Sequence, residues 1–183
     1  DEDQAESVIK HLCEVLVELH SCSIDKIDPD GALTDPFHRG IDIKSWDAFM
    51  DSTIEFFESS YTSLNYDPML MIALDAIYSL RRNKPRPMPL AIVHGDFNPA
   101  NFLYENGQVS ALIDWEASRV GDPREDLGWM VLMDVVSDAH VMDYPKKEGG
   151  FLAYYNKLTG NDITPEELGY LTLFGTMQIA VPV

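Results

Sequence analysis

Residues 90–129 of the chain read LAIVHGDFNPANFLYENGQVSALIDWEASRVGDPREDLGW and contain most of the information about its architecture. Two short apolar runs, residues 90–93 and 111–113, are each followed closely by an aspartate. The first is followed by His94-Gly95-Asp96 and the second by Asp114. Short apolar runs of this kind are typical of buried strands. We therefore expect two strands that place Asp96 and Asp114 at the rim of a buried sheet.

An amide side chain lies between the two acids, because Asn101 follows Asp96 five positions later. Asn98 and Pro99 suit the turn that this spacing requires, since proline restricts φ and asparagine tolerates unusual backbone angles. One carboxylate facing an acceptor hydroxyl, with an amide and a second carboxylate holding Mg²⁺ on ATP phosphates, is the arrangement used for phosphoryl transfer. Mg²⁺ prefers oxygen ligands and keeps several waters, so two protein ligands suffice.

Each of these residues also has a structural explanation. Asp96 could cap a turn, Asn101 could satisfy the backbone of a loop, and Asp114 could simply end a strand. Only the complete ordered set favours a phosphoryl-transfer site over these alternatives.

HGDFNPAN followed by LIDWE resembles the catalytic and metal-binding segments of the aminoglycoside phosphotransferase and choline kinase-like family, distant relatives of the protein kinases. The resemblance implies that Asp96 is the catalytic base and that Asn101 and Asp114 bind Mg²⁺. It also implies that His94 shapes the loop without acid–base chemistry. The later GDPREDL resembles the family segment whose second acid, here Asp126, braces the catalytic loop. These motifs cover about forty residues, and the remainder matches only in its pattern of helices.

The chain of 183 residues suits one domain, and 45% hydrophobic residues can form a sizeable core. No apolar run is long enough to span a bilayer, and Cys13 and Cys22 form neither a metal motif nor a disulfide framework. We therefore expect a cytoplasmic protein. The net charge of −18 argues against a nucleic-acid partner. The same charge could attract a cationic acceptor at long range, or serve only solubility.

Apolar residues at helical spacing predict a helix over residues 2–20, and His20 at its end is expected to be a satisfied structural histidine. A second helix over residues 45–60 carries an aromatic stripe expected in the core. Asp67-Pro68 predicts the start of the next helix. Further helices are predicted over residues 150–158 and, from a capping box at Thr164–Glu167, through Ile179.

Three segments between these elements have the sequence features of a linker, a turn and a helix cap. The prolines of RRNKPRPMP, residues 81–89, predict an extended, solvated linker, although a basic run can also bind phosphate. Asn106-Gly107 predicts a two-residue hairpin that returns Asp114 to the side of Asn101. Asp122, with Glu125 three positions later, predicts a helix N-cap.

A kinase of this type also needs a mainly β N-terminal lobe with a strand lysine and a loop over the phosphates. No such pattern occurs in the chain, which begins with Asp. We therefore expect residues 1–183 to form the C-terminal lobe of a longer kinase: an α+β, mostly helical lobe with short hairpin-like sheets. This piece alone should catalyse poorly.

The resulting functional prediction is phosphoryl transfer from ATP, with GTP as an alternative donor, to a hydroxyl of a small acceptor. Glu116, just beyond Asp114, could face a cationic acceptor or be a solvated loop acid. Aminoglycosides, amino alcohols, homoserine-like amino acids and sugars all fit the chemistry. The rival functions are a non-catalytic nucleotide-binding or interaction module and a metal-dependent phosphohydrolase, which would usually have more clustered His and Asp ligands.

Overall fold

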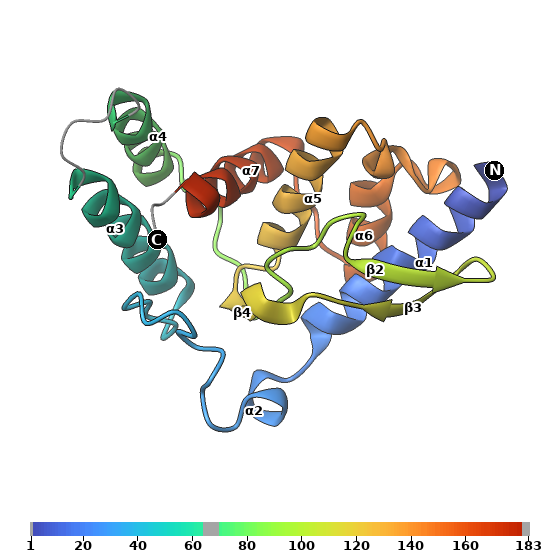
Figure 1. Ribbon diagram of the computed structural model, residues 1–183, viewed down its shortest axis with the longest axis horizontal. Helices are drawn as coiled ribbons and strands as arrows, with labels where there is room; N and C mark the ends of the chain where they lie inside the picture. Colours follow the sequence, from blue (N-terminus) through green and yellow to red (C-terminus); the bar gives the residue numbers. More distant parts are fainter. Residues whose placement is uncertain (1, 64–69, 181–183) are drawn as a thin grey trace.

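A computed structural model of the chain describes residues 2–63 and 70–180 (Figure 1). The predicted mostly helical α+β fold is confirmed. The helices are α1 (Glu2–Ser21), α2 (Ile24–Ile27), α3 (Trp46–Thr62), α4 (Leu70–Arg82), α5 (Arg124–Ser137), α6 (Phe151–Thr159) and α7 (Pro165–Ala180). The strands are β1 (Ala91–Val93), β2 (Phe102–Glu105), β3 (Gln108–Leu112) and β4 (Arg119–Gly121), and three 3₁₀ turns are η1 (Trp115–Ala117), η2 (Val141–Asp143) and η3 (Lys146–Glu148).

The described strands form two antiparallel pairs, but only one is a hairpin. β2 and β3 pair around Asn106-Gly107, where both residues have positive φ, as a tight two-residue turn requires. β1 instead pairs with β4, with Ile92 opposite Val120, so this sheet joins segments on either side of the hairpin. The expectation of two hairpin-like sheets was therefore wrong for the second sheet. This long-range pairing brings the two ends of the 90–129 stretch together.

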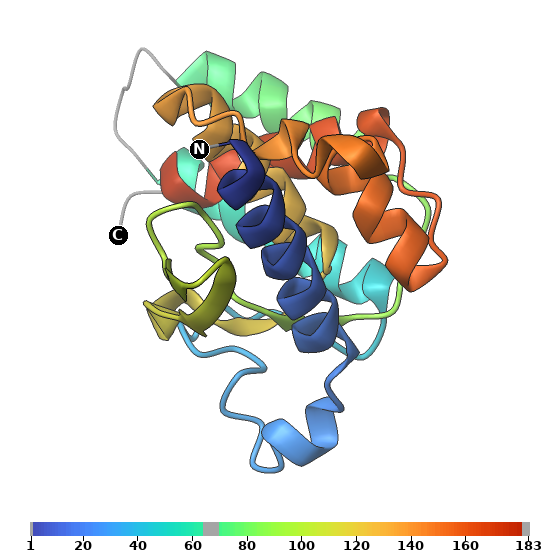
Figure 2. The same cartoon turned by 90° about the vertical axis from the view of Figure 1, so that its right-hand side faces the viewer.

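Two apolar clusters form the core, one on each side of the α5–α7 contact. The first joins α1 and α6 to the sheets and contains Val8, Leu12, Leu16, Phe97, Val109, Leu127, Phe151 and Tyr155. The second joins α3, α4 and α7 and contains Trp46, Phe49, Ile54, Phe57, Ile77, Leu171 and Phe174. The aromatic stripe of α3 is therefore core, as predicted. Figures 1 and 2 show α3 and α4 at one side of the molecule and α1 crossing the opposite side, beside the hairpin.

Close packing of α5 on α7 depends on Gly128. A Cβ at this position would lie 2.7 Å from the backbone carbon of Leu171, which is closer than real Cβ atoms come to backbone. Only glycine allows the two helices to approach this closely. The contact fixes α5, which begins beside the predicted catalytic loop.

The predicted helix starts are largely confirmed. Thr164 and Glu167 form a reciprocal capping box at 3.0 and 3.2 Å. At α5 the predicted bonds also form: the Glu125 carboxylate accepts the Asp122 amide at 2.8 Å, and the Asp122 carboxylate accepts the Arg124 amide at 2.9 Å. The N-cap itself is Pro123, one residue later than predicted. The start predicted at Asp67-Pro68 lies outside the described residues.

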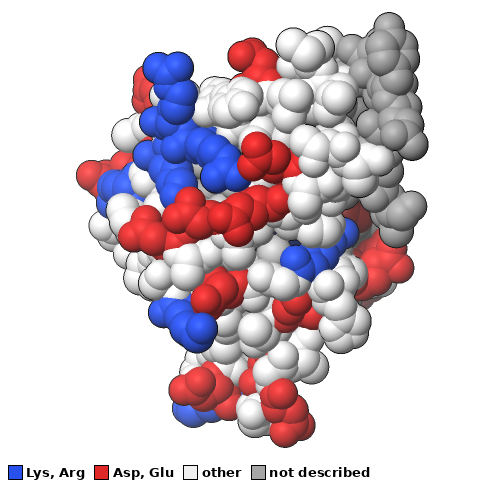
Figure 3. Space-filling model, turned by 90° about the vertical axis from the view of Figure 1, so that its left-hand side faces the viewer, with Lys and Arg blue, Asp and Glu red and all other residues white. Residues whose placement is uncertain are grey.

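The basic linker is less free than predicted. Its first two residues belong to α4, Asn83 still bonds to the Ser79 carbonyl, and residues 84–89 form neither helix nor strand. Ion pairs attach it to neighbouring helices, with Arg81 on Glu58 of α3 and Arg86 on Glu167 of α7. Figure 3 shows basic side chains gathered beside a band of acidic ones on this face. These basic groups are therefore largely satisfied within the chain. No helix among residues 2–63 and 70–180 has the length and apolar character of a membrane span.

Candidate active site

β1 delivers His94, which is fully buried at the start of the loop. Its Nε2–H donates to the Ile113 carbonyl at 2.9 Å, and its Nδ1 accepts the Asp96 backbone amide at 3.3 Å. Both ring nitrogens are thus used to join the loop after β1 to the end of the hairpin. This geometry suits the loop-shaping role predicted for His94. Neither ring nitrogen is left to face a phosphoryl-acceptor molecule.

Asp126, on the first turn of α5, is fully buried beneath the same loop. Its two oxygens accept the backbone amides of His94 and Gly95, each at 2.8 Å. His20 at the end of α1 donates to it at 3.1 Å and also contacts the Tyr155 hydroxyl at 2.8 Å. Burial alone would raise the pKa of Asp126, but the bonds from His20 and the two amides hold it below its ordinary value. An ionised Asp126 therefore ties α1, α5 and the loop together.

Asp96 follows in this loop, half-buried, with its carboxylate held by three side-chain N–H donors. Asn98 and Trp129 donate to Oδ1, each at 2.7 Å, and Asn101 donates to Oδ2 at 2.6 Å. Short bonds to a charged acceptor are strong and directional. The carboxylate is therefore fixed in one orientation at the edge of an open hollow.

Asn101 and Asp114 lie together as predicted, because the Ile113 amide donates to the Asn101 carbonyl at 3.0 Å. The Asn101 side-chain NH₂ is used by Asp96, which leaves its Oδ1 available as a ligand. Asp114 has φ of +65°, which turns the chain sharply after β3, and its exposed carboxylate bonds to no other described residue.

One amide oxygen and one free carboxylate are a donor set that fits Mg²⁺ when phosphate oxygens and water complete the shell. Among the described residues, no group of three or more His, Cys, Asp or Glu side chains could hold a metal by itself. The pair Asn101 and Asp114 thus suits a metal shared with a phosphate ligand. Its assignment as a metal site stays a prediction.

Beside Asp96 opens a hollow of about 250 Å³. Glu116, exposed on η1, contributes to its wall, as do Phe37, Arg39 and Trp129. The hollow is large enough for a small molecule beside the Asp96 carboxylate. The structure thus brings all the predicted residues around one loop: Asp96 and Glu116 on the hollow, Asn101 and Asp114 at the hairpin, and His94 and Asp126 beneath.

Sequence reasoning missed Trp129, whose indole N–H contacts the predicted catalytic carboxylate. A signal was present: Trp129 lies three residues after Asp126 on α5, and residues at this spacing share one helix face. It also missed Arg39 and the direct bond from His20 to Asp126. No local pattern indicates these two, because each comes from a distant segment.

Residues 1–161 match the family model described as the phosphotransferase enzyme family. The chain is similar in fold to a putative aminoglycoside phosphotransferase of Ralstonia eutropha JMP134, with TM-score 0.71, 18% identity, and coverage of 98% of this chain and 55% of that one. It is also similar to an aminoglycoside-3′-phosphotransferase of type VIII, with TM-score 0.67, 19% identity, and coverage of 97% of this chain and 62% of that one. A third similar structure is a choline/ethanolamine kinase family protein of Mesorhizobium loti, with TM-score 0.56, 19% identity, and coverage of 93% of this chain and 49% of that one.

Three conclusions follow from these comparisons. The chain spans about half to three-fifths of the length of the solved structures that it resembles. The predicted resemblance to aminoglycoside phosphotransferases and choline kinase-like proteins is confirmed. This chain belongs to the phosphotransferase enzyme family.

Proposed function

We propose that the protein transfers the γ-phosphoryl group of ATP to a hydroxyl of a small molecule. The observation that carries the proposal is the fixed Asp96 carboxylate on an open hollow. Beside it, on the adjoining loop and hairpin, lie the Asn101 side-chain oxygen and the Asp114 carboxylate, neither of which bonds to a described residue. Family membership supports phosphotransfer as the reaction class.

In this proposal the acceptor oxygen attacks the γ-phosphorus. Its bond to phosphorus forms as the bond between that phosphorus and the β,γ-bridging oxygen breaks, which yields a phosphate ester and ADP. Asp96 orients the hydroxyl and takes its proton. Asn98, Asn101 and Trp129 keep the carboxylate aimed at the hydroxyl, so little reorganisation is needed during the reaction.

Asn101 and Asp114 are the residues that would hold Mg²⁺. A metal held by these two residues would supply charge neutralisation for the transferring phosphoryl group. Asp126 and His94 position the loop from below and do not touch the reactants in this scheme.

We infer further that residues 1–183 act as the C-terminal lobe of a two-lobe kinase, and that the lobe covering the nucleotide belongs to the remainder of the protein. The share of the related structures that this chain spans supports this inference. The cytoplasmic location and the use of ATP rather than GTP stay predictions.

The sharpest test uses the full-length protein with Mg-ATP and a pooled panel of small alcohols. Mass spectrometry would search for a product heavier by one phosphoryl group. We expect this product from the parent and from Asp30→Ala, which removes an exposed acid whose side chain bonds to no described residue, but not from Asp96→Ala.

The other outcomes separate the rival functions. Nucleotide binding without turnover of any acceptor would favour a binding module. Phosphate released only to water would favour a phosphohydrolase. Absence of nucleotide binding would overturn the proposal.

A further inference from the structure

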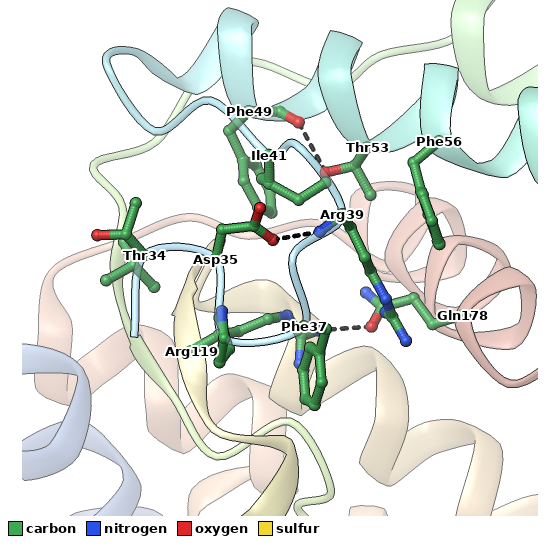
Figure 4. A pocket seen from close by; sticks show the side chains of 12 residues that line it. Thr34, Asp35, Phe37, Arg39, Ile41, Phe49, Thr53, Phe56, Arg119 and Gln178 are labelled. Carbon is green, nitrogen blue, oxygen red and sulfur yellow. Dashed lines mark hydrogen bonds between the residues drawn. The ribbon is translucent and has the colours of Figure 1, made fainter. Parts of the chain in front are cut away.

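The hollow beside Asp96 contains one feature that the proposed reaction does not use, the guanidinium of Arg39. Arg39 and Phe37 line both this hollow and an adjoining cavity of about 20 Å³. Figure 4 shows the Arg39 side chain extending from its loop past Phe56 towards Phe37 and Gln178. The guanidinium therefore stands in the space where an acceptor would bind.

The loop around Arg39 is held in place. The Asp35 carboxylate accepts the backbone amides of Arg39 at 2.8 Å and Gly40 at 2.7 Å. The guanidinium lies over the rings of Phe37 and Phe56, 4.7 and 5.0 Å from their centroids. Backbone bonds and aromatic rings thus position the side chain before any ligand arrives.

The Arg39 guanidinium makes no ion pair or hydrogen bond with any residue in the described ranges. Its neighbour Arg119 is fully engaged, since it donates to Glu125, Gln178 and the Ala117 carbonyl. A half-buried arginine that pairs with no described acid is unexpected in a chain with 31 acidic and 13 basic residues. Burial, with Arg119 nearby, lowers the pKa of Arg39, yet a guanidinium stays charged at neutral pH. A half-buried cation with five free N–H donors is suited to an anion.

We propose that Arg39 binds an anionic group, a carboxylate or a phosphate, on the acceptor whose hydroxyl faces Asp96. The proposal rests on the proposed function and names the substrate class. Phe37 and Trp129, on the same wall, would contact the carbon skeleton between the anion and the hydroxyl.

An anionic acceptor differs from the cationic one that the net charge of −18 could attract. Long-range attraction affects the association rate of a ligand, whereas bidentate contact with a guanidinium determines which ligand binds tightly. Glu116 on the same hollow can in addition take an ammonium group, so an acceptor that carries both charges is compatible with the proposal.

The test compares alcohols that differ only in charge, using the full-length protein and Mg-ATP. The pairs are 3-hydroxybutyrate with its amide and glycerol 3-phosphate with glycerol, and ethanolamine is the cationic probe. Both kcat/KM and the dissociation constant of each probe would be measured. We expect kcat/KM to be about 10- to 100-fold higher for the acid than for its amide, or for the phosphate than for its parent alcohol. This is the range for a hydrogen bond to a charged group. Which pair shows the difference distinguishes carboxylate from phosphate.

Arg39→Gln should abolish this preference and leave KM for ATP unchanged. Arg39→Lys should retain part of it, because the charge remains while the planar fork is lost. Arg82→Gln is the matched control, since Arg82 is exposed on α4, forms no ion pair with a described residue and does not line the hollow. Thermal unfolding would verify that the variants fold.

Equal use by the parent of the two members of both pairs, or a preference that survives in Arg39→Gln, would overturn the proposal. So would a rise in KM for ATP alone, which would assign Arg39 to the nucleotide. If no probe is phosphorylated, the dissociation constants still decide: equal binding of the members of both pairs refutes the role of Arg39. Failure of Mg-ATP binding would instead refute the proposed function, and the two failures are therefore distinguishable.

Discussion

The indole N–H of Trp129 donates to Oδ1 of Asp96 across 2.7 Å, which joins α5 directly to the predicted catalytic carboxylate. Asp126, one turn earlier on the same helix, accepts two amides of the loop that carries Asp96. One helix face thus holds both the backbone and the carboxylate of the loop. Misplacement of α5 would disturb both at once.

Trp129→Phe should lower kcat by about 10-fold, because it removes one charge-assisted bond from Asp96 while keeping an aromatic ring of similar shape. KM for ATP should hardly change. Trp115→Phe is the matched control, since its indole donates to the Leu112 carbonyl and not to a carboxylate. Steady-state kinetics with an identified acceptor measures the effect. Equal kcat in the Trp129 variant and the parent would show that the bond does not support turnover.

Asp114→Ala should reduce turnover by about 100-fold or more, because one of two predicted metal ligands is lost. The exposed carboxylate has no partner in the described chain, so the fold should persist. Alanine at φ of +65° adds strain of about 1 kcal/mol, which asparagine largely avoids. Asp114→Asn therefore separates loss of the ligand charge from strain. Kinetics at varied Mg²⁺ with thermal unfolding is the measurement, and a folded, fully active variant would refute the assignment.

Gly95→Ala should destabilise the fold by more than Gly40→Ala. Both glycines have positive φ, of +82° and +76°, so alanine adds a similar backbone strain of about 1 kcal/mol at each. Only at Gly95 would the new Cβ clash, lying 2.2 Å from the Ala117 carbonyl oxygen, whereas nothing lies within 4 Å at Gly40. Urea unfolding compares the two variants. Equal losses of stability would mean that the loop can move away from η1.

Asp126→Asn should show a loss of stability that depends on pH. The pKa of Asp126 in the folded chain lies below its ordinary value of 3.8, so its ionised form contributes fully above that value. This contribution disappears as the pH falls through the folded-state pKa. We expect a loss of about 2 kcal/mol at pH 7, as for buried hydrogen-bond donors left without their charged acceptor, and a smaller difference from the parent in acid.

Urea unfolding at several pH values from 7 down to about 2, below the ordinary pKa of Asp126, would measure the effect of Asp126→Asn, with Asp30→Asn as an exposed control. A difference that stays constant or grows in acid would contradict the assigned ionisation.

Local patterns predicted the helices and turns well because their causes are local. Apolar residues at helical spacing placed α1 and α3, and Thr164 with Glu167 placed the start of α7. Asn106-Gly107 predicted the hairpin, since both residues tolerate positive φ. The β1–β4 pairing was not foreseen, because a strand of three residues carries too little pattern to select a distant partner.

By itself, the sequence determined the helices, the hairpin and the order of Asp96, Asn101 and Asp114, since spacing and turn chemistry act within a few residues. The tertiary structure alone decided that Trp129 bonds Asp96, that His20 supports Asp126 and that Arg39 reaches the hollow. His20 and Asp126 are 106 positions apart, and their bond exists only because α1 packs against the sheets and α6. Which faces meet depends on burial summed over the whole core, and no single segment encodes that sum.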